Sequence, residues 1–428
     1  MHVRYPYFLR AAAHRRRGAD ERKNSDPTMD HCPQKREEKP VTTELIYFDN
    51  AATSFPKPPE VIRAVTTTMR HAGGNPGRGS HRLARDAANI LYNCREEIAD
   101  FLGAKDPTRV AFTQNTTHAL NTAIKGLLRP FDHVLISDME HNSVLRPIEA
   151  MQKTHHISYS VFSTATLQKA SNDCIERELS RHLCSQTRAV ICTHASNISS
   201  RTLPIKTIGR FCHKHKLIFI VDAAQSLGHL PLHMADMGIT ALCAPGHKGA
   251  YGPQGSGFLL LSDELDATAL PLPLMEGGSG YQSLLPDMPA LPPERYEAGT
   301  VATPMIAGLH AGIRFVRRVG IDAIRNHEEQ LFTLARDILL SFRNVTLYDK
   351  SEIGSVLSFS VSEQRAEEIA DLLDKEGICS RAGFHCTALA HRTLNTPSES
   401  GTVRLSFGHF NTPAQVQRLY PVLKRMLK

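Results

Sequence analysis

The sequence reads Leu217-Ile218-Phe219-Ile220-Val221-Asp222-Ala223-Ala224-Gln225 near its middle, and this stretch decides the fold. An uninterrupted apolar run ends there in a single acid. A second apolar run, residues 239–243, ends shortly before Gly246-His247-Lys248-Gly249. Short runs rich in branched apolar residues predict strands buried on both faces of a parallel sheet. The two predicted strands would place Asp222 and Lys248 at neighbouring strand ends, where such sheets bind their ligands.

Similar apolar runs surround this stretch, and segments with helical periodicity separate them. Alternation of strands and helices predicts an α/β fold with one large, mostly parallel sheet that has helices on both faces. Helices are predicted, among others, at residues 117–127 and 205–215. The predicted strands lie at residues 109–113, 133–137, 157–162, 189–193, 217–221, 239–243 and 257–261.

The C-terminal part of the chain predicts a second, smaller α/β domain. Residues 270–293 are rich in Pro and Gly and predict a long functional loop. A long helical pattern begins near residue 306. Shorter elements follow at residues 345–348, 355–361, 366–375 and 402–407, with a closing helix from Pro413. We therefore expect a large domain over residues 41–305, whose N-terminal segment packs on the small domain, and a small domain over residues 306–428.

Charge and hydropathy exclude several classes of protein. No apolar stretch reaches the roughly 20 residues that span a bilayer, so no membrane association is expected. The chain carries a net charge of +7, with ten Lys and Arg against six Asp and Glu within residues 1–40. The remainder is nearly balanced, which gives no support to nucleic-acid binding. Residues 1–40 predict a disordered basic tail. The alternatives are an Arg-rich presequence, or a true start at Met29.

The nine cysteines occur singly, at positions 32, 94, 174, 184, 192, 212, 243, 379 and 386. Because no C-x-x-C pair occurs, neither a zinc site nor any other metal site is predicted. Unpaired thiols in an odd number indicate a reducing compartment, so we expect a cytoplasmic protein.

The pairing of Asp222 with Lys248 indicates a pyridoxal 5′-phosphate enzyme. Such enzymes attach the cofactor to a lysine as a Schiff base, and a carboxylate keeps the pyridine nitrogen protonated. Asp222-x-x-Gln225, followed by Gly246-His247-Lys248-x-x-Tyr251-Gly252-Pro253, resembles the class V aminotransferases, and within them the cysteine desulfurases. The resemblance runs from about Tyr47 to the C-terminus. It implies the fold of the type I pyridoxal phosphate transferases, a homodimer, and a small C-terminal domain.

Thr116 and Thr117 open a predicted helix directly after a strand, where free N–H groups and hydroxyls form an anion site. The resemblance implies that these two residues and His247 bind the cofactor phosphate. It also implies that His141 stacks on the pyridine ring and relays protons. The family often has Ser or Thr where this chain has Pro245, so another donor must replace that hydroxyl.

Three further cofactor contacts are implied by the same resemblance. Asn197 and Gln225 are expected to reach the phenolic oxygen of the ring. Thr300, in Tyr296-Glu297-Ala298-Gly299-Thr300, is expected to reach the phosphate bound by the partner subunit.

Cys386 distinguishes this chain from an ordinary aminotransferase. It follows Arg381-Ala382-Gly383-Phe384-His385, and basic neighbours favour the nucleophilic thiolate. This R-x-G-x-x-C pattern resembles the group II cysteine desulfurases, whose cysteine lies on a short loop. Arg404 lies in a strand-like run, where a guanidinium could hold a substrate carboxylate, and Arg381 is a second candidate.

The expected activity is that of a cysteine desulfurase, with Lys248, His141 and Cys386 as catalytic residues. L-Cysteine would give L-alanine, and sulfur would pass to Cys386 as a persulfide and then to an acceptor protein, for iron–sulfur or other biosynthesis. A class V aminotransferase, or a β-lyase acting on selenocysteine or another amino acid, is the alternative. A sulfur-transfer scaffold without catalysis is a third reading, which the presence of Lys248, Asp222 and Cys386 disfavours.

Overall fold

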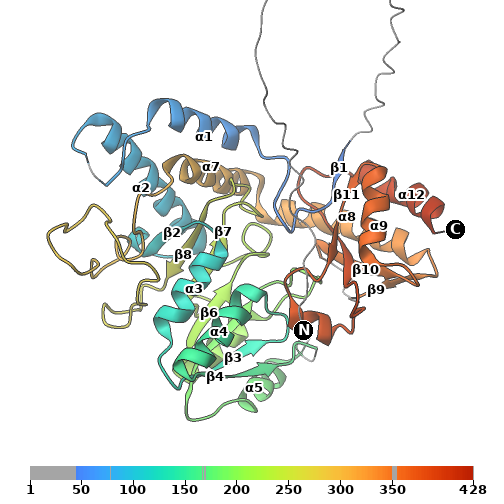
Figure 1. Ribbon diagram of the computed structural model, residues 1–428, viewed down its shortest axis with the longest axis horizontal. Helices are drawn as coiled ribbons and strands as arrows, with labels where there is room; N and C mark the ends of the chain where they lie inside the picture. Colours follow the sequence, from blue (N-terminus) through green and yellow to red (C-terminus); the bar gives the residue numbers. More distant parts are fainter. Residues whose placement is uncertain (1–44, 78, 166, 168–169, 349–353, 428) are drawn as a thin grey trace, which may run out of the picture. The chain divides into compact units, whose positions relative to one another are not determined.

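The computed structural model of the chain describes residues 45–77, 79–165, 167, 170–348 and 354–427 (Figure 1). The predicted tail, residues 1–40, lies outside these described residues. The described residues belong to a single compact unit. None of the helices in the described ranges is long and apolar enough to cross a membrane.

The larger sheet has seven strands in the order β2-β8-β7-β6-β5-β3-β4. Neighbouring strands are parallel, except that β8 runs antiparallel to both β2 and β7. The large, mostly parallel sheet predicted from the apolar runs is therefore confirmed. Its strands are β2 (Val110–Thr113), β3 (His133–Ser137), β4 (Ser158–Phe162), β5 (Thr187–Thr193), β6 (Ile218–Asp222), β7 (Ala241–Pro245) and β8 (Gly257–Leu261).

The strand before Lys248 starts two residues later than predicted. Ile239 is buried, but its backbone N–H donates to the carbonyl of Met234, 3.1 Å away, inside a turn. The ladder runs instead from Ala241 to Pro245. Burial alone therefore does not mark the start of a strand, and the shift brings the strand end closer to Lys248.

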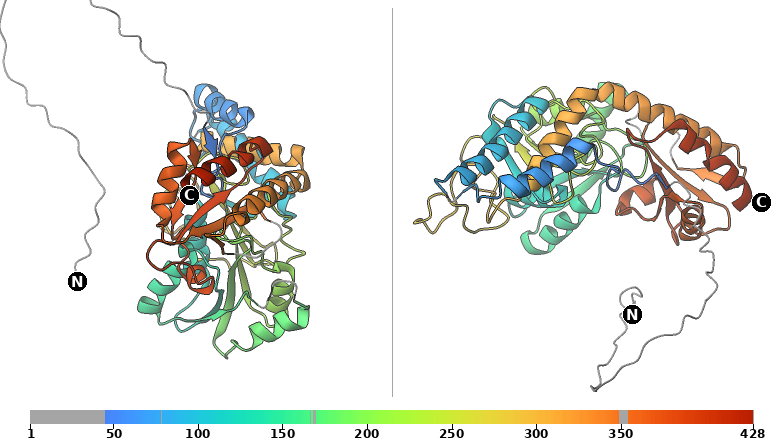
Figure 2. Two further views of the ribbon diagram at one scale, coloured as in Figure 1. Left: turned by 90° about the vertical axis from the view of Figure 1, so that its right-hand side faces the viewer. Right: turned by 90° about the horizontal axis from the view of Figure 1, so that it is seen from above.

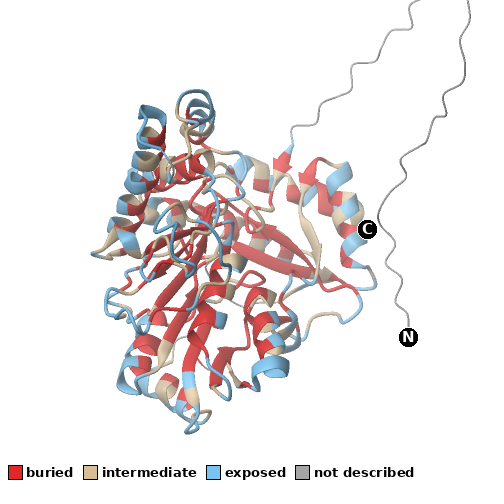
Figure 3. Cartoon of the chain, turned by 60° about the vertical axis from the view of Figure 1, so that its left-hand side comes forward, coloured by how far each residue is buried: buried red, intermediate tan, exposed pale blue. Residues whose placement is uncertain are grey.

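Helices cover both faces of this sheet (Figure 2). One hydrophobic cluster joins Phe112, Val190 and Phe219 to helices on one face, and a second joins Ala111, Ala189 and Ile220 to helices on the other. Alternate strand residues therefore feed opposite cores, as the period of two requires. Strands β2, β3, β7 and β8 are accordingly buried throughout their length, whereas the edge strand β4 begins at the exposed Ser158 and is half-buried up to Phe162 (Figure 3). The helices of this part are α1 (Pro59–His71), α2 (Arg82–Leu102), the short 3-10 helix η1 (Pro107–Arg109), α3 (Thr116–Leu127), α4 (Asn142–His155), α5 (Asn172–Ser180), α6 (Ile205–Lys214) and α7 (Thr303–Val319).

The C-terminal part is built on a four-stranded antiparallel sheet in the order β12-β13-β10-β9. The strand β1 (Ile46–Tyr47), from the start of the described chain, pairs in parallel with β11 (Ile378–Cys379). Ile46 and Phe48 belong to the same hydrophobic cluster as the C-terminal helices. The remaining elements are β9 (Val345–Leu347), β10 (Val356–Val361), β12 (Arg381–Gly383), β13 (Thr402–Ser406), α8 (Ile321–Leu340), α9 (Ala366–Lys375), α10 (Ala388–Thr393), α11 (Pro413–Gln417) and α12 (Leu419–Met426).

Helix α7 packs differently from the other elements after residue 305. Ile306, Leu309 and Ile313 belong to the core of the large sheet, whereas Leu331, Ala335 and Leu339 of α8 belong to the C-terminal cluster. A domain boundary at residue 306 stays a prediction, and hydrophobic packing favours one between α7 and α8.

Candidate active site

A cavity of about 180 Å³ lies at the carboxyl ends of the parallel strands. Every residue that the sequence assigned to cofactor or substrate lines it, except Thr300 and Cys386. The lining residues are Ala51, Ala52, Asn115, Thr116, Thr117, Met139, His141, Ser143, Thr193, Ala195, Asn197, Asp222, Ala224, Gln225, His247, Lys248, Arg381, His385 and Arg404.

Asp222 and Lys248 reach the cavity from neighbouring strands. Asp222 is the last residue of β6, opposite Cys243 in the parallel ladder with β7, and Lys248 follows β7 by one tight turn. The Asp222 carboxylate accepts a 2.9 Å hydrogen bond from the Ala224 N–H, and burial raises its pKa. Burial lowers the pKa of Lys248 to about 8, although the Asp222 charge opposes this change. Lys248 is therefore readily obtained as the neutral amine, the nucleophilic form.

The turn before Lys248 is held by a segment that the sequence reasoning missed. The carbonyl of His247 accepts from Ser54 N at 3.0 Å and from Lys57 Nζ at 2.9 Å. The Ser54 hydroxyl lies 2.9 Å from the carbonyl of Lys248. Burial lowers the pKa of Lys57 to about 8. The available signal was the polar stretch Thr53-Ser54 with Lys57, directly after the short strand near Tyr47.

One end of the cavity fits a phosphate group. Helix α3 begins at Thr116, and the Asn115 side chain caps it by accepting from His118 N at 3.0 Å. Thr116 Oγ1 and His247 Nδ1 are buried, with no hydrogen-bond partner among the described residues. Burial, with the nearby Lys248 and Lys57 charges, lowers the pKa of His247 to about 4. A buried, unpartnered hydroxyl beside a helix N-terminus forms a site that an anion would satisfy.

His141 is the N-cap of α4 and is neutral in this environment. Its Nδ1 accepts from the Ser143 N–H at 3.0 Å, which leaves the proton on Nε2. Burial, helped by the Lys248 charge, lowers the pKa of His141 to about 4. The Ser143 hydroxyl also lies 2.8 Å from His141 Nδ1 and 2.8 Å from Thr117 Oγ1. Ser143 was not predicted, and its place in Glu140-His141-Asn142-Ser143 was its only signal.

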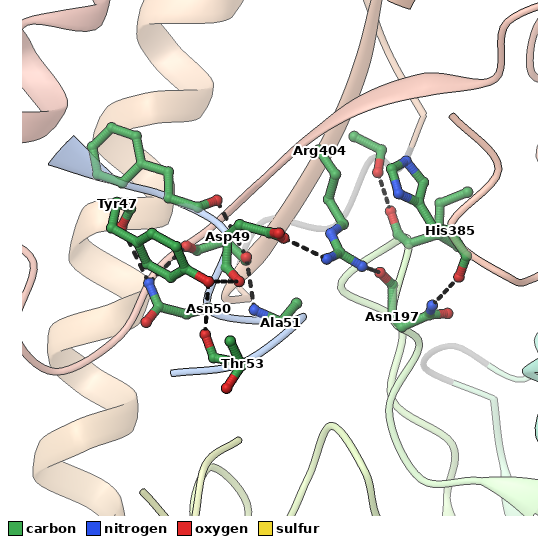
Figure 4. A network of polar contacts seen from close by, with 12 residues as sticks. Tyr47, Asp49, Asn50, Ala51, Thr53, Asn197, His385 and Arg404 are labelled. Carbon is green, nitrogen blue, oxygen red and sulfur yellow. Dashed lines mark hydrogen bonds and ion pairs between the residues drawn. The ribbon is translucent and has the colours of Figure 1, made fainter. Parts of the chain in front are cut away.

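Arg404 occupies the centre of a buried polar network (Figure 4). Its side chain is 1% exposed, and Nη2 forms an ion pair of 2.7 Å with Asp49. Its Nη1 donates to the carbonyl of Asn197 at 2.9 Å, and its Nε has no partner among the described residues. The sequence therefore placed Arg404 at the cavity but missed Asp49, which lies 355 positions away in the chain.

Asn197 links this network to the segment that carries Cys386. Its Nδ2 donates to the carbonyl of His385 at 2.7 Å (Figure 4). Its Oδ1 accepts from the Thr387 hydroxyl at 2.6 Å. The amide nitrogen carries a second N–H, and Asn197 lines the cavity. The Asn197 amide therefore anchors both residues that flank Cys386.

Cys386 is exposed at the tip of a tight loop after β12. His385 and Cys386 both adopt left-handed backbone conformations, with φ values of 46° and 58°. Such conformations are strained for consecutive non-glycine residues and persist only where surrounding contacts enforce them. The Asn142 N–H, which donates to the Cys386 carbonyl at 2.8 Å, supplies one such contact.

One part of the expectation for Cys386 is wrong. His385 was expected to favour the thiolate as a basic neighbour, but it is 4% exposed, and burial with the Arg404 charge lowers its pKa to about 2. His385 is therefore neutral. Its Nε2 donates to the carbonyl of Thr402 at 3.1 Å, so it acts as a support of the loop. Arg381 is then the remaining basic side chain of the motif that lines the cavity.

Thr300 lies outside the cavity, on the exposed surface. Its hydroxyl accepts from Asn75 Nδ2 at 3.2 Å. Gln225, by contrast, lines the cavity and donates from Nε2 to the carbonyl of Ala51 at 3.0 Å. Within the described ranges, no group of three or more His, Cys, Asp and Glu could hold a metal ion.

Comparison with known proteins shows which family the fold and site resemble. Residues 46–419 match the family described as aminotransferase class-V. The chain is 32% identical over 401 residues to a probable cysteine desulfurase of Methanothermobacter thermautotrophicus, covering 91% of this chain and 97% of that protein. A probable cysteine desulfurase of Pyrococcus abyssi is 31% identical, covering 92% of this chain and 97% of that protein.

Solved structures agree with these matches. The apo structure of a cysteine desulfurase from Thermococcus onnurineus superposes with a TM-score of 0.80 at 29% identity, covering 90% of this chain and 96% of that one. A cysteine desulfurase from Escherichia coli superposes with a TM-score of 0.77, covering 90% of this chain and 94% of that one. At 24% identity, the second likeness shows the fold alone.

Proposed function

This chain belongs to the class V aminotransferase family, and we propose that it is a pyridoxal phosphate-dependent cysteine desulfurase that converts L-cysteine to L-alanine. One observation carries the proposal. The cavity that holds Lys248 and Asp222 also holds Asn197, whose amide anchors the residues on both sides of Cys386. An ordinary aminotransferase has no use for a thiol next to a residue, His385, that lines its cavity.

Pyridoxal 5′-phosphate fits the groups that line the cavity. The unpartnered Thr116 hydroxyl, Thr117 and His247 would hold its phosphate, and Lys248 its aldehyde carbon. Asp222 would face the pyridine nitrogen, because a buried carboxylate gains from a cationic N–H partner. Asn197 and Gln225 would donate to the phenolic oxygen, and His141 would stack on the ring. When bound, the cofactor supplies an electron sink for negative charge at the substrate α-carbon.

The residues of this chain have separable roles in the reaction. Lys248 removes the substrate α-proton as a neutral amine, which its lowered pKa makes available near neutrality. Arg404 and Arg381 attract the substrate carboxylate. His141, with its proton on Nε2, is placed to pass that proton within the cavity.

Cys386 takes the sulfur. Its thiolate bonds to the substrate sulfur as the Cβ–S bond breaks, and the bonding electron pair stays with the carbon skeleton. That skeleton takes up protons and leaves as L-alanine, while Cys386 keeps the sulfur as a persulfide. The persulfide sulfur then passes to an acceptor, for iron–sulfur cluster assembly or another sulfur-requiring synthesis. A class V aminotransferase, or a β-lyase acting on selenocysteine, remains the alternative.

We infer a cytoplasmic homodimer in which Thr300 of each chain reaches the phosphate bound by the other. Thr300 is exposed and absent from the cavity of its own chain, which supports this inference. Replacing it in Thr300→Ala should weaken cofactor retention by about 1–3 kcal/mol, the cost of one lost hydrogen bond to a charged group. Cofactor release measured by gel filtration would test this, and a fully active monomer by sedimentation would contradict it.

The central test is Cys386→Ser with L-cysteine as the substrate. The variant should keep its cofactor and bind cysteine, but form no alanine above background, because no thiolate accepts sulfur. Mass spectrometry of the wild type should show one added sulfur on the peptide that contains Cys386. Cys174→Ser, which alters another of the cysteines that are not buried, is the matched control. If Cys386→Ser forms alanine at the full rate, the chain is not a desulfurase of this kind, and the broader lyase or aminotransferase function takes its place.

A further inference from the structure

Ser143 connects the phosphate end of the cavity to His141. Its hydroxyl oxygen lies 2.8 Å from Thr117 Oγ1 on one side and 2.8 Å from His141 Nδ1 on the other. All three side chains line the same cavity, and Ser143 is 7% exposed. The chain Thr117–Ser143–His141 therefore forms a continuous line of hydrogen bonds from helix α3 to the ring of His141.

Counting protons decides how this line is arranged. The Ser143 backbone N–H already donates to His141 Nδ1 at 3.0 Å, so that nitrogen carries no proton and can only accept. The contact between Ser143 Oγ and His141 Nδ1 must then use the Ser143 hydroxyl proton. The contact between the two hydroxyls must in turn use the Thr117 proton. Both hydroxyl protons are thereby consumed within the line.

An anion at Thr117 Oγ1 requires a different arrangement. An unprotonated phosphate oxygen only accepts, so Thr117 must direct its proton to that oxygen. Ser143 must then donate to Thr117, because the contact between two hydroxyls needs one proton. The Ser143 hydroxyl has only one proton to give. His141 Nδ1 consequently loses the hydrogen bond from the Ser143 hydroxyl and keeps only the one from the Ser143 N–H.

We propose that the Ser143 hydroxyl is a positioning switch that couples anion binding at Thr117 to the hydrogen bonding of His141. This proposal rests on the proposed function only in assigning the cofactor phosphate to Thr117. A donor to Nδ1 disfavours protonation of the ring, so losing one raises the basicity of His141. An anion at Thr117 thereby makes His141 a better proton carrier.

Nitrogen NMR of ¹⁵N-histidine-labelled full-length protein without cofactor tests the switch, with inorganic phosphate as the probe. The experiment is done near pH 7, and the His141 signal is identified by its absence in His141→Gln. In the wild type, phosphate should shift the Nδ1 resonance toward that of an imidazole nitrogen that has lost one donor. Phosphate binding itself is measured in parallel by titration.

Two variants should fix the His141 Nδ1 resonance in opposite states, and in neither should the resonance respond to phosphate. In Ser143→Ala, Nδ1 should resemble the phosphate-bound wild type both before and after phosphate is added. In Thr117→Val, Ser143 keeps donating to His141, so Nδ1 should resemble the phosphate-free wild type in both conditions. Phosphate should bind Thr117→Val about 10- to 100-fold more weakly, as expected for a lost hydrogen bond to an anion.

Thr122→Val is the matched control, because Thr122 lies in the same helix and its hydroxyl bonds to the His118 carbonyl at 3.0 Å. It should respond as the wild type does. Three outcomes would overturn the proposed switch. Phosphate could bind without a change at Nδ1, it could cause the same change in all variants, or it could fail to bind. None of these outcomes bears on alanine formation from cysteine, which tests the proposed function separately.

Discussion

The floor of the cavity and the loop that carries Cys386 are built on opposite principles. The floor, defined here as Thr116, Asp222, His247 and Lys248, lies at strand and helix ends, and burial sets its ionisation. The loop, residues 383–387, exposes Cys386, and its strained backbone is held by contacts from distant segments. Regular secondary structure can position a cofactor, but presenting a nucleophile to both substrate and acceptor requires exposure. The sheet does not hold this loop, so individual hydrogen bonds from distant segments fix its backbone.

The largest effect should come from removing the amine of the floor. Lys248→Ala should retain no covalently attached cofactor and should form alanine at less than about one thousandth of the wild-type rate. Borohydride reduction followed by peptide mapping measures the attachment. Lys57→Ala is the matched control, because burial lowers the pKa of Lys57 to about 8, as it does that of Lys248. In this control the label should stay on Lys248. A label on any lysine other than Lys248 would contradict the assignment of the floor.

A smaller but still large effect is expected where floor and loop meet, at Arg404. Arg404→Ala should weaken cysteine binding and also lower the free energy of unfolding by about 3–5 kcal/mol, because Asp49 would lose its buried ionic partner. Denaturant unfolding and cysteine titration measure the two quantities. Unchanged stability with weaker cysteine binding would mean that Arg404 serves the substrate alone and does not join the two regions.

Loosening the loop alone should have an intermediate effect. Thr387 is fully buried and absent from the cavity lining, and its hydroxyl donates to Asn197 Oδ1 at 2.6 Å. Thr387→Val should leave that acceptor unsatisfied, at a cost of about 1–3 kcal/mol. Hydrogen exchange should rise at residues 384–388, and alanine formation should fall while cofactor affinity is kept. Exchange that rises equally over the whole chain would indicate a general loss of stability instead.

The smallest effect is a dependence of stability on pH that comes from the floor. The pKa of Lys248 lies at about 8 in the folded chain, below the 10.5 of an ordinary lysine. Between these values the unfolded chain holds a proton on Lys248 that the folded chain lacks, so the contribution of Lys248 to the free energy of unfolding rises with pH across this window. Below pH 8 both states are protonated and the cost of the buried charge is constant.

In Lys248→Met without cofactor, the change in the free energy of unfolding across this pH window should be about 1–3 kcal/mol less positive than in the wild type without cofactor. Lys57, whose pKa is lowered from 10.5 to about 8, should still contribute a rise. The buried Cys94 and Cys192, whose pKa values burial raises, should contribute a fall in both proteins. Urea unfolding at a series of pH values measures the slope. An identical slope in the two proteins would show that the floor does not hold Lys248 at a lowered pKa.

Apolar periodicity in the sequence determined the α/β fold and the positions of its strands along the chain, because a buried parallel strand needs a continuous apolar run. It also determined that Asp222 and Lys248 reach one cavity, since parallel strands end at the same edge. The motifs around Thr116, His141, Asn197 and Arg404 singled out residues that line this cavity, because each follows or lies in a strand.

Only the tertiary structure decided which of these groups contact one another and which are charged. The pairing of Arg404 with Asp49 joins residues 355 positions apart, and no local pattern reports such a separation. His385 appeared basic in the sequence, but burial makes it neutral, and desolvation depends on every segment that packs around the ring. Likewise, the Ser143 hydroxyl gains its role only because α3 and α4 bring Thr117 and His141 to its two sides. Strand patterns are local properties of the chain, whereas ionisation and hydrogen-bond partners are properties of the assembled core.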